Sequence, residues 1–135
     1  MSFLLDTDWT IDFLGGRPPA QALVAQLLRQ DLAISIVTYM EVLEGIRGRP
    51  VPKPREREFR RFLKSIRVIT LGRPIAVRAA DIRVDLRRRK RPVDDRALDI
   101  LIVATAIEHN LILVTRNTRD YEDIPDLRLY ESGQT

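Results

Sequence analysis

The sequence contains no cysteine and a single histidine, His109. Without thiols the chain can form neither a disulfide nor a thiolate zinc site, and one imidazole cannot build a histidine-rich metal site. Any metal held within this chain must therefore be bound by oxygen atoms, which favours hard cations such as Mg²⁺ or Mn²⁺. We assign His109 no catalytic role, because the dipole of a predicted helix explains a histidine near its end.

Long hydrophobic runs are also missing. No apolar stretch approaches the roughly 18 to 20 residues that a membrane-spanning helix needs, and Asp6 and Asp8 interrupt the order expected of a signal peptide. We therefore expect a cytoplasmic protein. The 135 residues, 44% hydrophobic and 31% charged, predict one globular domain over residues 1–135, and we find no repeat or second domain.

The charge is moderately basic. The net charge is +4 and the pI about 9.9, with arginine supplying nearly all of the positive charge. Such a surface suits a phosphate-bearing partner, although many ordinary proteins are equally basic. The densest run, Arg87-Arg88-Arg89-Lys90-Arg91, has two interpretations that the sequence leaves open: an RNA-binding edge, or the solvated C-terminal end of a helix.

Apolar segments with strand character alternate with segments of helical periodicity. This order predicts an α/β fold with a mostly parallel central sheet of four to five strands and helices on both faces. The expected strands are 2–5, 32–37, 68–71, 111–114 and 127–130. Helices are expected at 7–14, 38–46 (capped by Thr38) and 55–65. Three more are expected: one that begins at Pro18 and Pro19, one from Pro74 into the arginine run, and one that is capped by Asp94 or Asp95 and ends near Asn110. Residues 131–135 are expected to form a frayed tail.

Acidic side chains fall where parallel strands end. Asp6 directly follows the first strand, Glu41 lies in the first turn of the helix after the second, and Asp120 follows the fourth, with Asn117 between. Ligands of open α/β sheets bind at the carboxyl ends of the strands, so these acids belong to one edge. Taken singly, each has a structural explanation, as a helix cap, a solvated helix acid or a turn cap.

Asp99 requires a separate argument because it lies on an otherwise apolar helix, with Ile102 and Val103 on its face. A carboxylate in packed surroundings is costly unless a cation is paired with it. An arginine such as Arg96 or a bound Mg²⁺ would serve, and both remain open. Four clustered carboxylates would repel one another, and a divalent cation that activates water and clamps phosphodiester oxygens resolves that conflict.

Four segments match a known family in order and spacing across essentially the whole chain. They are 4–8, 35–45, 99–106 and 115–121, with sequences LLDTD, SIVTYMEVLEG, DILIVATA and TRNTRDY. In these segments the chain resembles the PIN-domain ribonucleases, and among them the VapC toxins of prokaryotic toxin–antitoxin pairs.

The resemblance implies functional residues. Asp6, Glu41, Asp99 and Asp120 would form the acidic metal site, and Thr7, Thr115 and Asn117 would support it. Asp8 stands where relatives often have asparagine, so it either adds a fifth carboxylate or caps the first helix. Some relatives carry an acid at the place of Asn117, which leaves open whether Asn117 or Asp120 lies nearer the metal. Arg116 joins the arginine run as a candidate RNA contact, whereas Trp9 and Tyr39 are expected to be groove walls or dimer contacts more than base-stacking platforms.

The resemblance also implies an activity and partners. One or two Mg²⁺ ions, or Mn²⁺ as a substitute, would position water for attack on RNA, leaving 5′-phosphate and 3′-hydroxyl ends. Such toxins are typically homodimers, silenced by a VapB-type antitoxin whose tail enters the acidic groove.

The alternatives are a PIN scaffold without activity and a phospho-acceptor module. The latter expects a lysine late in the chain, but Lys90 is the last one.

Overall fold

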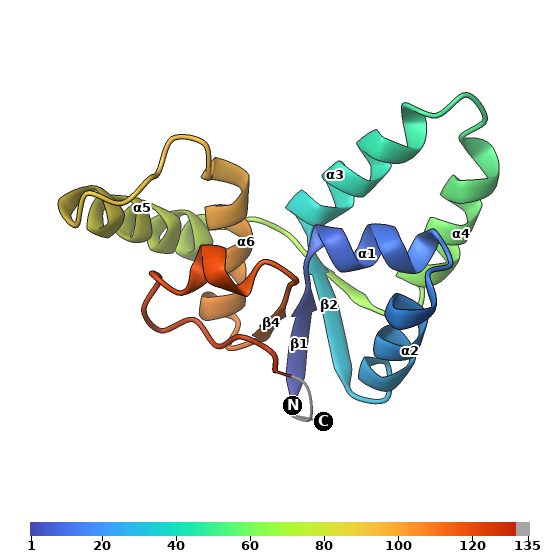
Figure 1. Cartoon of the computed structure of the whole chain (residues 1–135), viewed down its shortest axis with the longest axis horizontal. Helices are drawn as coiled ribbons and strands as arrows, with labels where there is room; N and C mark the ends of the chain where they lie inside the picture. Colours follow the sequence, from blue (N-terminus) through green and yellow to red (C-terminus); the bar gives the residue numbers. More distant parts are fainter. Residues whose placement is uncertain (132–135) are drawn as a thin grey trace.

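A parallel sheet forms the centre of the computed structural model, which describes residues 1–131 (Figure 1). Its strands are β1 (Ser2–Leu5), β2 (Asp31–Ser35), β3 (Arg67–Ile69) and β4 (Ile112–Val114), in the order β3-β2-β1-β4. Every pairing is parallel. The predicted α/β class is confirmed, whereas the expected tail beyond Glu131 lies outside the described residues.

Helices pack on both faces of this sheet (Figure 1). They are α1 (Thr7–Leu14), α2 (Pro18–Leu27), α3 (Ile36–Arg47), α4 (Lys53–Leu63), α5 (Arg73–Arg88) and α6 (Ala97–Glu108), followed by a short 3-10 helix, η1 (Thr118–Tyr121). Alternation along β1 directs Phe3 and Leu5 into the core with α1, α2, α3 and α4, and Leu4 into the core with α5 and α6. Among the described residues no helix is long and apolar enough to cross a membrane.

The end of the second strand differs from the prediction. Strand β2 stops at Ser35, whose fully buried hydroxyl caps α3 by accepting hydrogen bonds from the backbone N of Val37 (2.8 Å) and Thr38 (3.4 Å). Assigning Val37 to the strand and the cap to Thr38 was therefore wrong, because β-branched residues in the first helical turn resemble a strand. Glu41 consequently lies in the second turn of α3.

Two further expectations were also wrong. Helix α6 begins after Arg96 without a side-chain cap, and Asp94 instead lies 3.4 Å from Arg87. The predicted fifth strand is reduced to one parallel bridge between Leu113 and Leu129.

The strand order determines where the functional side chains meet. The carboxyl ends of β2, β1 and β4 are neighbours, so the starts of α3 and α1 and the segment after β4 converge (Figure 1). The backbone N of Asp6 donates to the carbonyl of Val114 at 2.9 Å, which fixes the Asp6 backbone against the end of β4. This edge of the sheet is the one predicted to carry the acids.

Candidate active site

Asp6 is the most enclosed acid at this edge, with only 5% of its surface exposed. It is the N-cap of α1, and its Oδ1 accepts a hydrogen bond from the backbone N of Thr7 at 2.8 Å. Burial, followed by the nearby charge of Asp8 and that of Asp99, raises its pKa to about 6, against the lowering effect of hydrogen bonds from Thr115 and Thr7. Asp6 therefore caps a helix and also experiences a concentration of negative charge.

Glu41 reaches the same site from α3 through threonine hydroxyls. Thr7 Oγ1 donates to Glu41 Oε1 at 2.7 Å and lies 3.0 Å from Thr38 Oγ1. Thr38 is buried and Glu41 half-buried. The hydroxyl of Thr7 therefore orients Glu41 toward the start of α1, where Asp6 lies. Thr38 was not among the predicted supporting residues, because its inward direction became visible only with the true start of α3.

Asp8 is fully engaged by hydrogen-bond donors. Its Oδ1 accepts from the backbone N of Trp9 at 2.6 Å, and its Oδ2 accepts from the backbone N of Arg116 at 3.0 Å and from Thr115 Oγ1 at 3.4 Å. Asn117 joins the same network, since its backbone N donates to Thr115 Oγ1 at 3.2 Å. The segment after β4 is thereby attached to the first turn of α1.

Asp99 projects from the first turn of α6, half-buried, above the buried side chains Ile102 and Val103. Burial raises its pKa, and the charges of Asp120 and Asp8 add to this rise, opposed by a hydrogen bond from Tyr121 and by the charge of Arg96. The predicted alternative, an ion pair with Arg96, is not formed among residues 1–131. Arg96 instead contacts both carboxylate oxygens of Asp123 at 3.0 Å.

Tyr121 is a residue that sequence reasoning did not assign to the site. It is 4% exposed and hydrogen-bonded to Asp99, and burial together with the charges of Asp6 and Asp99 raises its pKa. A buried tyrosine hydroxyl requires a polar partner, which is the signal that could have identified it. Its neighbour Asp120 is exposed on η1, and its charge helps to raise the pKa of Asp99.

Some of the basic side chains form ion pairs within the protein and others do not. Arg89 pairs with Asp85 at 2.6 Å and Arg91 with Asp123 at 3.1 Å, whereas among the described residues neither Arg88 nor Lys90 forms an ion pair. Arg116 lies over the ring of Trp9 and pairs with Asp12. Part of the basic run is therefore structural, and part remains accessible to a ligand.

The chemistry of the site suits a hard cation, since its acidic and hydroxyl side chains offer oxygen ligands. Within residues 1–131 no three acidic or histidine side chains converge tightly enough to enclose an ion as they stand. Three of the four predicted acids instead accept hydrogen bonds from neutral donors: Asp6 from Thr7 and Thr115, Glu41 from Thr7, and Asp99 from Tyr121. These donors orient carboxylates whose mutual repulsion a cation would relieve.

Comparison with known proteins identifies the family. The PIN domain model matches residues 3–127. The tRNA(fMet)-specific endonuclease VapC of Shigella flexneri is 30% identical over 95% of this chain and 96% of its own length. Ribonuclease VapC19 of Mycobacterium tuberculosis is 30% identical over 93% and 96%.

Solved structures agree with this result. DNA-bound VapBC of Salmonella typhimurium has a TM-score of 0.85 at 26% identity, covering 96% of this chain and 97% of that one. A toxin–antitoxin complex of Klebsiella pneumoniae has a TM-score of 0.75 at 32% identity, covering 96% and 99%. The chain therefore belongs to the PIN-domain family, and within it to the VapC nucleases.

Proposed function

We propose that this protein is a Mg²⁺-dependent endoribonuclease and the toxin of a type II toxin–antitoxin pair. The observation that carries the proposal is the Asp6 carboxylate, buried at the strand ends, where burial first and then the charges of Asp8 and Asp99 raise its pKa to about 6. Maintaining that unfavourable concentration of charge is typical of a catalytic site. A protein that only bound RNA would not require acidic side chains held so close together.

Asp6, Glu41, Asp99 and Asp120 would hold the metal. Bound Mg²⁺ would supply a water of lowered pKa and offset negative charge on the scissile phosphate. The chain itself orients the carboxylates: Thr7 directs Glu41, and the Tyr121 hydroxyl directs Asp99. Because these supports come from α1 and η1, they fix the acids before substrate arrives.

RNA binding would use the basic groups that the fold leaves available. Arg88 and Lys90 lie at the end of α5 without ion pairs among residues 1–131, and each would contribute a salt-sensitive phosphate contact. We also propose a homodimer, for which α5 offers Val77 and Val84, two turns apart on one face and 61% and 44% exposed.

The activity is tested by incubating the purified chain with RNA, beginning with tRNA(fMet), for which the relatives from Shigella and Salmonella are named. We expect cleavage in Mg²⁺ or Mn²⁺, none in EDTA, and products with 5′-phosphate and 3′-hydroxyl ends. Ligation-based mapping of 5′ ends reads this directly. Retarded but uncut RNA across transfer, ribosomal and messenger substrates would instead indicate a binding scaffold.

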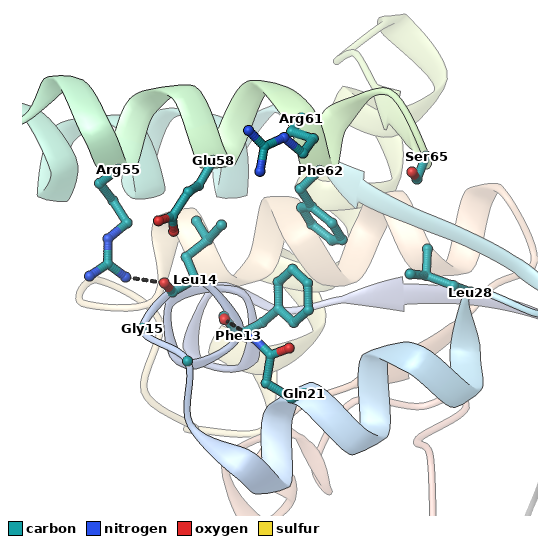
Figure 2. A pocket seen from close by; sticks show the side chains of 11 residues that line it. Phe13, Leu14, Gly15, Gln21, Leu28, Arg55, Glu58, Arg61, Phe62 and Ser65 are labelled. Atoms are coloured by element: carbon teal, nitrogen blue, oxygen red, sulfur yellow. Dashed lines mark hydrogen bonds between the residues drawn. The ribbon is translucent and has the colours of Figure 1, made fainter.

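The proposed partner is a VapB-type antitoxin, since similar solved structures are VapBC complexes. An open hollow of about 530 Å³ between α1, α2 and α4 offers it a surface. Figure 2 shows the rings of Phe13 and Phe62 next to each other, with Arg55 and Arg61 among the other residues that line the hollow. The two ring centroids lie 4.8 Å apart. An apolar antitoxin segment would fill this hollow, and a basic side chain of its tail would enter the acidic site.

Replacing Leu28 by aspartate is expected to impair inhibition by the antitoxin without affecting cleavage. Leu28 lines the hollow and is 36% exposed, so a carboxylate there removes apolar contact without unfolding the core. Inhibition curves with the product of a neighbouring small reading frame should shift at least about tenfold, the effect of losing roughly 1.4 kcal/mol. Leu71→Asp, at a 43% exposed position outside the hollow, is the control; an equal shift in both variants would refute this surface.

A further inference from the structure

Asp8 and Arg116 join the start of α1 to the segment that follows β4. Asp8 uses one carboxylate oxygen for the backbone N of Trp9 (2.6 Å) and the other for the backbone N of Arg116 (3.0 Å). Both oxygens therefore have backbone partners. These contacts give Asp8 a structural role, because it links the first turn of α1 to the segment after β4.

The side chain of Arg116 strengthens this link from the other side. Its Cζ lies 4.3 Å from the centroid of the Trp9 ring, and its guanidinium pairs with Asp12, one turn further along α1. The side chain of Asp12 is only 14% exposed, so this pair is shielded more than an ordinary surface salt bridge. We call Asp8, Trp9, Asp12 and Arg116 the α1 clasp.

The clasp holds residues that reach the acid site. Thr115, directly before Arg116, is 7% exposed, and a hydrogen bond from it lowers the pKa of Asp6. Val114, directly before Thr115, accepts a hydrogen bond from the backbone N of Asp6 at 2.9 Å. Asn117, directly after it, donates its backbone N to Thr115 Oγ1 at 3.2 Å. Release of Arg116 would therefore free the segment that orients Asp6, even though the guanidinium itself points to α1.

We propose that Arg116 is a positioning residue, which acts through Thr115 on the catalytic carboxylate, and that its charge is used by Trp9 and Asp12 and not by RNA phosphate. The inference rests on the proposed ribonuclease function. It predicts that Arg116 and Asp12 work as one unit. A phosphate ligand would behave differently, because Asp12 would then compete with RNA for the guanidinium.

The test compares Arg116→Ala, Asp12→Asn and the double variant in steady-state cleavage of one RNA. For a positioning role we expect each single variant to lower kcat about tenfold with KM unchanged, and the double variant to be no worse than either. Arg116→Lys should recover part of kcat, because an ammonium still contacts Trp9 and Asp12. Arg119→Ala, which removes an exposed arginine from the same segment, controls for loss of charge.

The opposite pattern would overturn the proposal. If Arg116 binds phosphate, Arg116→Ala raises KM and weakens its salt dependence, whereas Asp12→Asn lowers KM by releasing the guanidinium. Amide hydrogen exchange over residues 115–117 gives a second readout that needs no activity. Faster exchange in both single variants supports the clasp, and unchanged exchange refutes it, even if the chain cuts none of the RNAs tested.

Discussion

Replacing Asp6 by asparagine is expected to abolish RNA cleavage while leaving the protein folded. Asparagine keeps the size of the side chain and the oxygen that accepts from Thr7 N at 2.8 Å, so α1 retains its cap. It loses the charge on which the proposed metal site depends. We expect kcat to fall at least about 10²- to 10³-fold, the scale of losing one preorganised electrostatic group, together with any growth arrest on expression. Cleavage at the wild-type rate would refute the catalytic assignment.

The stability of the same variant provides its control. The folded pKa of Asp6 is raised from 3.8 to about 6, so the folded protein binds this proton more tightly than the unfolded chain. The contribution of Asp6 to stability is then fully present below pH 3.8 and is lost as the pH rises through about 6, by about 3 kcal/mol in total. In EDTA, Asp6→Asn should therefore unfold at higher urea than wild type at pH 7.5, with little difference near pH 4. Equal urea midpoints at pH 7.5 would show that the ionised Asp6 side chain does not destabilise the folded protein.

Addition of Mn²⁺ or Mg²⁺ is expected to raise the melting temperature of the wild-type chain. An ion that binds only the folded state at a hundred times its Kd stabilises it by about 2.7 kcal/mol, or roughly 8 °C for a domain of this size. The Asp99→Asn variant should lose most of this response. Because burial and the charges of Asp120 and Asp8 raise the pKa of Asp99, the variant should also be more stable than wild type without metal at neutral pH.

Asp94→Asn is the matched control for this experiment, since the Asp94 side chain is 95% exposed and pairs with Arg87, away from the acids. It should respond to Mn²⁺ as the wild type does. Differential scanning fluorimetry across a metal titration, in wild type and both variants, measures the effect. An undiminished shift in Asp99→Asn would remove Asp99 from the metal site, and no shift in the wild type would argue against metal binding there.

Much of the architecture followed from patterns within single segments. Short apolar runs alternating with amphipathic ones predicted the parallel sheet, and the core positions Ile75, Ala79, Ile82 and Leu86 of α5 are buried as their helical spacing indicates. The errors lie at the ends of elements. Ile36 and Val37 have strand propensity, yet the Ser35 hydroxyl begins a helix there, because a cap hydrogen bond and tertiary packing outweigh small intrinsic preferences.

The sequence by itself determined that the chain must use oxygen ligands, since it has no cysteine and only one histidine. It also determined that Asp6, Glu41 and Asp120 belong to one edge of the sheet, because parallel strands end together. Tertiary structure alone decided the partners of these acids. Tyr121 lies beside Asp99, Arg96 is occupied by Asp123, and Asp8 is linked to Arg116 across more than a hundred residues of chain. Such contacts join segments that are far apart in the sequence, so the periodicity within a single segment does not predict them. They form only when the whole sheet has assembled.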